Sequence, residues 1–340
     1  MPFRDVIGHR RLINLLARSV ARQSLPPSLI FAGPAGVGKR LTAIALAQAL
    51  NCLKPQRTKD APDSVDACGA CAACKRIARG VHPDVTEIKP DEKGSIKIEP
   101  VREMINSAGY RPFEGKRRVV IIDEADALER GAQNALLKTL EEPPSGSVFV
   151  LVTSRPDVLL PTVRSRCPEL RFRALGNDEL AQALIARGLS ETEARTVAAT
   201  AGGSVGQALE AGAAELVEAR DVAQRVLAHV AANREPRRRL DGAKELLAGT
   251  GSGGAADREQ LATHLRAMAA ILRDVELLSL GSIAGLTLAN PDIEAALDRL
   301  KPAYAGDRGV RAFAAVDRAL VALERNASPK IVADWLLLEL

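Results

Sequence analysis

The sequence predicts an α/β domain with a largely parallel β-sheet over residues 1–173, followed by an all-helical remainder over residues 174–340. In the first part, short apolar runs alternate with helical patterns, as expected when helices join parallel strands. The runs Val119–Ile122 and Val148–Val152 are continuous and rich in β-branched residues, which is typical of central strands covered on both faces. Beyond Arg173 such runs vanish and helix-capping patterns take their place.

The elements of the first part follow in chain order. Leu29–Ala32 is a predicted buried strand between two Pro and a Gly-Pro pair, and the Ala- and Leu-rich residues 41–50 predict the next helix. Residues 54–67 carry two Pro and many charges, so we expect a loop. A helix over residues 132–142 is expected to end before Pro143, because a residue preceding Pro disfavours the α conformation.

The second part divides into two predicted helical domains. In residues 174–212, Asp178 is expected to cap a helix, while Ser190 with Glu193 and Ser204 with Gln207 form capping-box patterns. Residues 213–340 predict a longer helical domain, interrupted by a flexible Gly-rich segment at residues 249–254. Apolar residues recur there at helical spacing, which an ordinary helical core explains, namely Leu261, Leu265 and Leu272.

Composition narrows the class of protein. With 46% hydrophobic residues the chain is globular, and no uncharged apolar run reaches the ~18 residues needed to span a bilayer. No secretory signal opens the chain, so we expect a cytoplasmic protein without membrane contact. Residues 1–173 hold 28 Lys+Arg against 19 Asp+Glu, which favours polyanions or is simply a solvated surface. Because only 3% of residues are aromatic, any DNA contact should involve phosphates.

Four of the five cysteines predict a metal site. Cys68, Cys71 and Cys74 follow a C-x2-C-x2-C pattern with small residues between them, and Cys52 precedes them. Such spacing lets four thiolates converge on one ion, and a filled four-sulfur shell favours structural Zn²⁺. An iron–sulfur cluster or free buried thiols are the alternatives. Cys167 is expected to be a small buried apolar residue instead.

A phosphate-binding loop is predicted directly after the first strand. Gly33, Gly36, Gly38 and Lys39 fit the pattern G-x4-G-K-[ST], in which backbone N–H groups cradle phosphates and the Lys reaches the terminal ones. Arg40 replaces the hydroxyl residue that would ligate Mg²⁺. Asp123 and Glu124, after strand 119–122, would supply the carboxylates of a nucleotide site: one for the metal and one to polarise water.

These segments, together with Asp5–His9, Leu136–Pro144 and Ser165–Cys167, resemble in order those of the bacterial clamp-loader subunits of DNA polymerase III, an AAA+ family. The resemblance implies an AAA+ P-loop domain (1–173) with a zinc module at about residues 52–74, a small helical lid (174–212) and a helical collar (213–340). It places Ile7 near the adenine, and Thr153 or Ser154 at the polar sensor. It makes Arg166 an arginine finger offered to a neighbouring subunit.

Two departures from the family pattern bear on activity. Arg40 removes the metal-binding hydroxyl, and Gly206 stands where ATP-hydrolysing members carry an Arg. The resemblance therefore implies a stator-like subunit that binds ATP or ADP weakly, keeps Glu124 as a vestige, and completes a neighbour's site with Arg166. Implied partners are gamma/tau and delta subunits, the beta sliding clamp and primer–template DNA. An active ATPase motor of the same family and a standalone zinc-containing DNA-binding protein are the alternatives.

Overall fold

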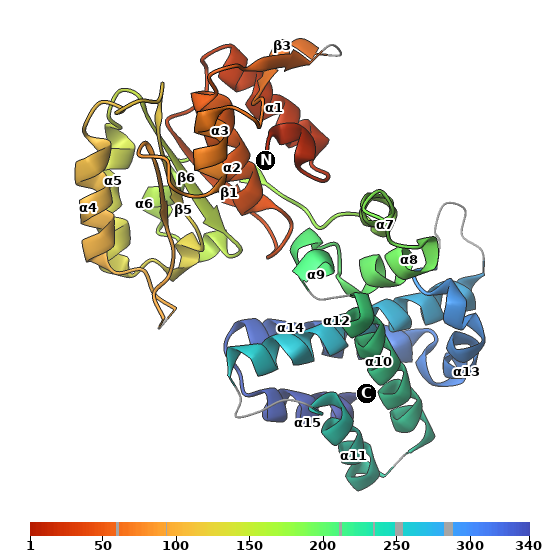
Figure 1. Cartoon of the computed structure of the whole chain (residues 1–340). Helices are drawn as coiled ribbons and strands as arrows, with labels where there is room; N and C mark the ends of the chain where they lie inside the picture. Colours follow the sequence, from red (N-terminus) through yellow and green to blue (C-terminus); the bar gives the residue numbers. More distant parts are fainter. Residues whose placement is uncertain (59–60, 93, 211–212, 234, 249–253, 282–287) are drawn as a thin grey trace. The chain divides into compact units, whose positions relative to one another are not determined.

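The computed structural model describes residues 1–58, 61–92, 94–210, 213–233, 235–248, 254–281 and 288–340 (Figure 1). Within them the chain forms two compact units, Met1–Ala174 and Leu175–Leu340. No described helix is long and apolar enough to cross a membrane.

The N-terminal unit is built on a parallel five-stranded sheet in the order β4-β5-β6-β1-β7. Its strands are β1 (Ser28–Ala32), β4 (Val85–Ile88), β5 (Arg118–Ile122), β6 (Ser147–Thr153) and β7 (Glu169–Arg171). The three predicted strands are confirmed as β1, β5 and β6, the central three, whose residues are almost all buried. In a parallel sheet all carboxyl ends lie at one edge, so the loops after β1, β5 and β6 meet there.

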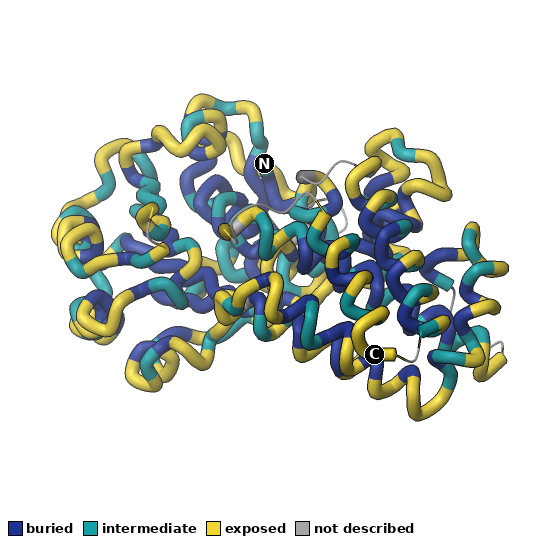
Figure 2. Tube along the Cα trace, turned by 90° about the horizontal axis from the view of Figure 1, so that it is seen from below, coloured by how far each residue is buried: buried dark blue, intermediate teal, exposed yellow. Residues whose placement is uncertain are grey.

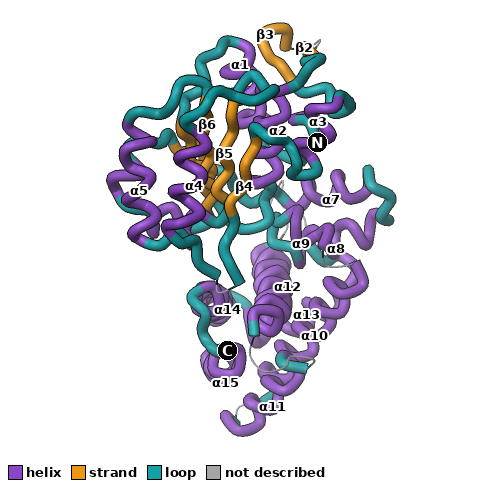
Figure 3. The backbone as a smooth tube through the Cα atoms, turned by 60° about the vertical axis from the view of Figure 1, so that its left-hand side comes forward, coloured by secondary structure: helices purple, strands orange, loops and turns teal. Residues whose placement is uncertain are grey.

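Helices cover both faces of this sheet (Figures 1 and 3). One face carries α1 and α2, whose apolar residues join those of β1 in one core cluster, while α4 and α5 form the other cluster. The helices of the unit are η1 (Phe3–Asp5), α1 (Arg10–Ala21), α2 (Lys39–Asn51), α3 (Ala72–Ala78), α4 (Ile98–Ala108), η2 (Ala125–Ala127), α5 (Arg130–Glu141), η3 (Pro156–Val158) and α6 (Pro161–Arg164). The helices expected over 41–50 and 132–142 are thus confirmed as α2 and α5.

The prediction of a loop over residues 54–67 is wrong. Strands β2 (Gln56–Thr58) and β3 (Ala61–Asp66) form an antiparallel hairpin there. Polar bonds rather than an apolar pattern hold it. The Asp66 carboxylate accepts the backbone N–H groups of Phe3 (2.8 Å) and Arg4 (3.2 Å), and Asp63 pairs with Arg18 of α1 and with Arg22, its C-cap. Long-range polar bonds of this kind leave no period in the sequence.

The C-terminal unit is entirely helical in its described residues. Its helices are α7 (Asn177–Ile185), α8 (Glu191–Thr200), α9 (Val205–Glu210), α10 (Ala213–Ala232), α11 (Pro236–Leu246), α12 (Ala255–Leu280), η4 (Pro291–Ile293), α13 (Glu294–Tyr304), α14 (Asp307–Glu324) and α15 (Pro329–Glu339). Leu261, Leu265 and Leu272 are buried in α12, within the shared core. Figure 2 shows buried residues running through the interior of the unit with exposed ones on its outer turns.

The capping predictions have mixed outcomes. The Ser190–Glu193 capping box forms at α8, and the Ser204 hydroxyl accepts the N–H of Gln207 (3.2 Å) at α9. Asp178 does not cap: α7 starts one residue earlier, with Gly176 at the N-cap, which leaves Asp178 in the first turn near the helix dipole. The predicted flexible segment falls mostly on residues 249–253, outside the described ones. The proposed lid and collar helices share one compact unit, and their separation into two domains stays a prediction.

Candidate nucleotide site and cysteine cluster

The P-loop lies between β1 and α2, as its motif requires. Gly33 has a φ of +148°, and an added Cβ would stand 2.1 Å from the backbone oxygen of Phe172. Only glycine fits here, because the N–H of Phe172 also bonds to Ala32 O at 2.7 Å and draws the two segments together. Gly36 (φ +71°) and Gly38 (φ +97°) complete the turn, and Gly38 is the N-cap of α2. The free N–H groups of the first turn of α2 therefore face the loop.

Lys39 is folded back onto its own loop. Its Nζ donates to the backbone oxygens of Gly33 (2.6 Å) and Pro34, and the residue is buried. Burial lowers the pKa of Lys39 to about 8, against the opposing attraction of Asp126 and Asp123. The Lys39 ammonium is therefore already hydrogen-bonded within its own loop.

Arg40 lies where a metal-binding hydroxyl is expected, and its guanidinium is paired with two carboxylates. Nε and Nη2 make a two-point contact with the Glu87 carboxylate of β4, with Nη2 2.9 Å from Oε2. Nε is also 3.4 Å from Oδ2 of Asp123. Hydrogen bonding to Glu87 raises the pKa of Arg40, so the guanidinium is always charged. Burial raises the pKa of Asp123, an effect that the attraction of Arg40 only partly offsets.

The third acid of the segment, Asp126, is engaged by the loop after β6. Its Oδ1 accepts the Thr153 hydroxyl (2.8 Å) and the N–H of Ser154 (3.3 Å), and its carboxylate pairs with Arg155. Both candidate polar-sensor residues therefore contact Asp126. Glu124 is exposed beside it, with the left-handed φ of +49° that few non-glycine residues adopt.

Thr42, which follows Arg40 by two residues, does not replace the lost hydroxyl. Its Oγ1 donates to Gly38 O (2.9 Å) within α2, and the residue is fully buried. Ile7 is partly buried just ahead of α1, near His9, whose ring lies 4.9 Å from that of Phe172. None of these contacts tests the adenine role, which stays a prediction.

Arg166 follows α6 in a short segment anchored by buried Val163 and Cys167. Its side chain is 31% exposed, donates to Thr162 O (2.7 Å) and pairs with Glu141 at the end of α5. Cys167 is buried as expected, and burial raises the pKa of its thiol to about 11. The guanidinium is thus held at the surface on a rigid base.

The four predicted metal-ligand cysteines converge. The Sγ atoms of Cys52, Cys68, Cys71 and Cys74 all lie within 4.8 Å of one another, and those of Cys52 and Cys71 are 4.0 Å apart. A tetrahedral ion with Zn–S bonds of about 2.3 Å would separate the sulfurs by about 3.8 Å. Backbone N–H groups of Cys68 and Cys71 donate to Cys52 Sγ and Cys68 Sγ, both at 3.3 Å. The donor set fits a four-thiolate metal.

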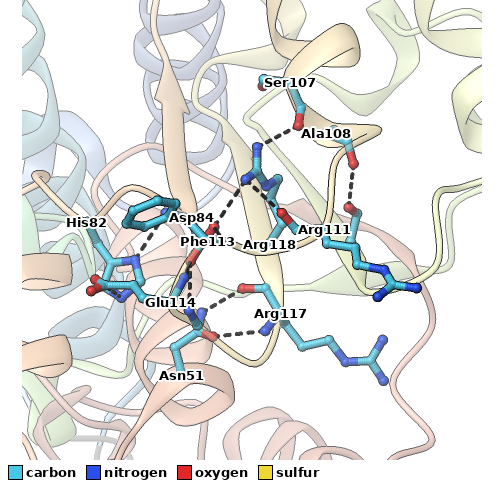
Figure 4. A network of polar contacts seen from close by, with 12 residues as sticks. Asn51, His82, Asp84, Ser107, Ala108, Arg111, Phe113, Glu114, Arg117 and Arg118 are labelled. Carbon is cyan, nitrogen blue, oxygen red and sulfur yellow. Dashed lines mark hydrogen bonds and ion pairs between the residues drawn. The ribbon is translucent and has the colours of Figure 1, made fainter.

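A buried polar network fixes the loop beside this cluster (Figure 4). The fully buried Asp84 carboxylate accepts the N–H groups of Phe113 (2.6 Å), Glu114 (2.9 Å) and Gly115 (2.7 Å), and Arg118 Nη2 lies 3.1 Å from it. Asn51, the last residue of α2, accepts the N–H groups of Lys116 and Arg117 through Oδ1. The loop before β5 and the chain entering the cysteine cluster therefore form one rigid edge.

The structure brings Gly33, Lys39, Asp123 and Ser154 to the carboxyl edge of the sheet, and adds two residues that the sequence analysis did not select. Glu87 lies inside the edge strand β4, in register with Ile121 of β5, and holds Arg40. Glu141 lies in the segment Leu136–Pro144, but no pattern in the sequence indicates its pairing with Arg166. Both contacts become visible only when the strand order is known.

The N-terminal unit is similar in sequence to known proteins. Residues 8–176 match the family model described as "DNA polymerase III, delta subunit". Among curated relatives, DNA polymerase III subunit tau/gamma of Haemophilus influenzae is 37% identical over 182 residues (54% of this chain, 25% of that protein). Subunit delta' of Bacillus subtilis is 33% identical over 188 residues (55% and 54%), and delta' of Pseudomonas aeruginosa is 35% identical over 136 residues (40% and 39%).

The match to these relatives is partial, because the chain spans about half the length of the Bacillus relative and about a quarter of the Haemophilus one. Among solved structures, a DNA polymerase III gamma subunit-related protein of Thermotoga maritima has a TM-score of 0.48 at 18% identity, covering 94% of this chain and 95% of that chain.

Proposed function

We propose that this chain is the delta-prime subunit of the AAA+ clamp loader of DNA polymerase III, because its N-terminal unit matches the DNA polymerase III family model and is similar to delta' and tau/gamma relatives. In this role it is a stator: it does not hydrolyse ATP itself, and it supplies Arg166 to the ATP site of a neighbouring subunit while the sliding clamp is loaded onto primed DNA.

The observation that carries the proposal is the ion pairing of Arg40. Its guanidinium lies between Glu87 and Asp123, so the carboxylate that a motor subunit uses for its metal already has a cation. A metal-assisted phosphoryl transfer needs that carboxylate for the ion. Gly206, at the start of α9, supports the same role, because it offers no side chain where the family's motor subunits carry an Arg.

Arg166 suits the second half of the role. A guanidinium aimed at a γ-phosphate stabilises the spreading negative charge of the transition state, and such a finger is worth ~10³–10⁵ in rate. The rigid base provided by Val163 and Cys167 limits the conformations that Arg166 must lose on docking. The Glu141 carboxylate holds the guanidinium until a phosphate, which carries more negative charge, replaces it.

The test is a reconstituted loader in which the P-loop Lys of every motor subunit except the neighbour of this chain is substituted. We expect Arg166→Ala to lower the remaining DNA- and clamp-stimulated ATPase by at least about 10³-fold. Arg164→Ala, two residues away and exposed, is the matched control and should leave the rate unchanged. An undiminished ATPase in a correctly assembled Arg166→Ala complex contradicts the proposal.

An active motor of the same family is the second candidate, because tau/gamma relatives match the same part of the chain. ATP turnover by the purified chain alone distinguishes the motor from the delta-prime subunit. The delta-prime proposal expects no Mg²⁺-dependent ATP hydrolysis above that of a Lys39→Ala variant. Sustained turnover that Lys39→Ala abolishes would favour the motor.

We further propose that the four-cysteine cluster holds one structural Zn²⁺. The convergent sulfurs and the N–H groups directed at them support this ion, and a filled sulfur shell leaves no position for a substrate. Metal analysis should find about one zinc per chain, lost in Cys74→Ser and kept in the control Cys167→Ser. Iron with inorganic sulfide, or far less than one zinc, would refute the assignment.

The remaining proposed partners follow from the delta-prime role: gamma/tau and delta subunits in one ring, the beta sliding clamp and primer–template DNA. For DNA, the excess of Lys and Arg in residues 1–173 supports contacts with phosphates. Binding by the assembled loader should then weaken steeply with salt. Mass measurement of the chain mixed with those subunits tests the ring.

A further inference from the structure

The Arg40 pairing has a consequence for ligand binding as well as for hydrolysis. Mg²⁺ needs oxygen ligands near the β- and γ-phosphates, and a P-loop protein normally provides a hydroxyl and a carboxylate for it. Here the hydroxyl is absent, and Oδ2 of Asp123 lies 3.4 Å from Arg40 Nε. The described residues of this site therefore do not fit a metal ion.

The guanidinium is held in place by Glu87 as well as by Asp123, and both carboxylates approach its Nε. Glu87 binds it at two points in the fork geometry that Arg and carboxylate share, and the attraction of the opposite charges favours the pair, with the Glu87 carboxylate about one-fifth exposed. Lys89 adds a second cation 3.4 Å from the Glu87 carboxylate. With two carboxylates facing two cations the cluster is neutral, so it gains little by attracting a divalent ion.

The rest of the phosphate cradle is intact. The glycine turn has its positive φ angles, the first turn of α2 presents free N–H groups, and Lys39 lies at the loop. Arg40 is in this same first turn, so its positive charge lies next to the position where phosphates would bind. A guanidinium carries five N–H donors and pairs well with phosphate oxygens.

From these contacts we propose that the P-loop binds nucleoside di- or triphosphates without a metal ion, with Arg40, held by Glu87, providing the positive charge that Mg²⁺ provides elsewhere. Arg40 and Glu87 are then the residues that set the form of the ligand: the free nucleotide rather than its Mg²⁺ complex. The inference concerns this chain's own pocket and does not depend on Arg166, so it can hold or fail separately from the delta-prime proposal.

The experiment is equilibrium binding of fluorescent ADP and ATP to the purified full chain, in excess Mg²⁺ and in EDTA. The wild type should bind in EDTA at least as tightly as in Mg²⁺, within about threefold. Lys39→Ala should abolish binding under both conditions, which assigns the signal to the P-loop. Arg40→Thr restores a hydroxyl and frees Asp123, so Mg²⁺ should strengthen its binding at least about tenfold.

Two further variants complete the test. Arg102→Thr removes an exposed arginine of α4 and should behave as wild type under both conditions. Glu87→Gln keeps Arg40 but removes its anchor, and should weaken binding in EDTA. For Arg40→Thr, Mn²⁺ resonance reports metal entry, and circular dichroism reports folding.

The proposal is overturned if the wild type needs Mg²⁺ for binding, if it binds no nucleotide in either condition, or if well-folded Arg40→Thr gains no metal dependence. None of these outcomes affects the reconstituted ATPase test of Arg166. A loader that fails with Arg166→Ala while this chain binds free nucleotide supports both proposals.

Discussion

Asp84 is the buried group whose loss should cost the N-terminal unit most, and Asp84→Ala is the perturbation that measures it. The carboxylate is fully buried and accepts three backbone N–H groups at 2.6–2.9 Å, and Arg118 lies 3.1 Å away. Burial opposes its charge, but the N–H groups of Glu114, Phe113 and Gly115 and the charge of Arg118 outweigh it, so the pKa of Asp84 is below its ordinary value.

The magnitude follows from what the substitution leaves behind. Removing one partner of a buried ion pair costs about 3–5 kcal/mol, and each hydrogen bond to a charged group is worth about 1.5–3 kcal/mol. Two relaxations reduce the sum. Glu114 is exposed, so its N–H can reach water, and Arg118 keeps bonds to the backbone oxygens of Ser107 and Arg111. We expect Asp84→Ala to lower the free energy of unfolding of this unit by about 3–4 kcal/mol.

The chain carries its own internal reference for the assay. Trp335 is its single tryptophan and belongs to the C-terminal unit, so tryptophan fluorescence follows that unit alone during urea unfolding. Circular dichroism follows both. Asp84→Ala should move the N-terminal transition to lower urea, leave the Trp335 transition unmoved, and speed amide exchange at residues 113–115. The exposed Glu103→Ala in α4 is the control, with an effect within about 0.5 kcal/mol.

The direction of the pKa shift of Asp84 determines how its contribution to stability changes with pH. Because the folded-state pKa of Asp84 is depressed, its stabilisation is present above about pH 3.9 and is lost as pH falls through the folded-state pKa. The difference in stability between wild type and Asp84→Asn should therefore shrink as pH falls below about 4. A loss under about 1 kcal/mol for Asp84→Ala, or an equal shift of the Trp335 transition, would refute the reasoning.

Three further outcomes are expected. Gly33→Ala places a Cβ against Phe172 O and should destabilise the N-terminal unit by about 2–4 kcal/mol. The control Gly80→Ala, where φ is positive but the space is open, should cost about 1 kcal/mol. Equal shifts of the urea midpoint for the two variants would contradict this prediction. Chelation, or acidification that protonates the thiolates, should lower the melting temperature of the same unit only, and an unchanged melt would contradict a structural metal. Arg220→Ala removes a buried guanidinium and its bond to the part-exposed Asp292 (2.6 Å), which should lower the free energy of unfolding followed by Trp335 by about 1–3 kcal/mol, checked by urea unfolding.

The sequence was sufficient for the centre of the sheet and failed at its edges for a physical reason. Strands β1, β5 and β6 are buried on both faces, so their residues are continuous apolar runs. Edge strands β4 and β7 carry Thr86, Glu87 and Arg171 because one side is open, and their pattern resembles a loop. Strands β2 and β3 are held by Asp66 and Asp63, and bonds between residues so far apart in the sequence leave no periodic pattern.

The same dependence on local patterns explains which residues of the candidate site could be predicted from the sequence. Residues that must follow one strand or begin one helix, such as Lys39 and Asp123, are fixed by local patterns, and the cysteines by their spacing. Glu87 and Glu141 act through partners 47 and 25 residues away, on elements whose neighbourhood depends on strand order. A missing hydroxyl at position 40 can be recognised in the sequence, but only the fold shows that the arginine in its place is itself paired with two carboxylates.

Arg40 and Arg166 differ in how strongly neighbouring carboxylates hold them, and both proposals depend on this difference. Arg40 has two carboxylate partners with Lys89 beside them, so a metal ion at Asp123 would have to displace an existing ion pair. Among the described residues, Arg166 pairs with one carboxylate, that of Glu141, which is itself about half exposed. An exposed ion pair is worth at most about 1 kcal/mol, so a phosphate of a neighbouring subunit can take its place at little cost. In the proposed function, Arg40 therefore stays paired within this chain's own site, while the arginine offered to a neighbouring subunit is readily released.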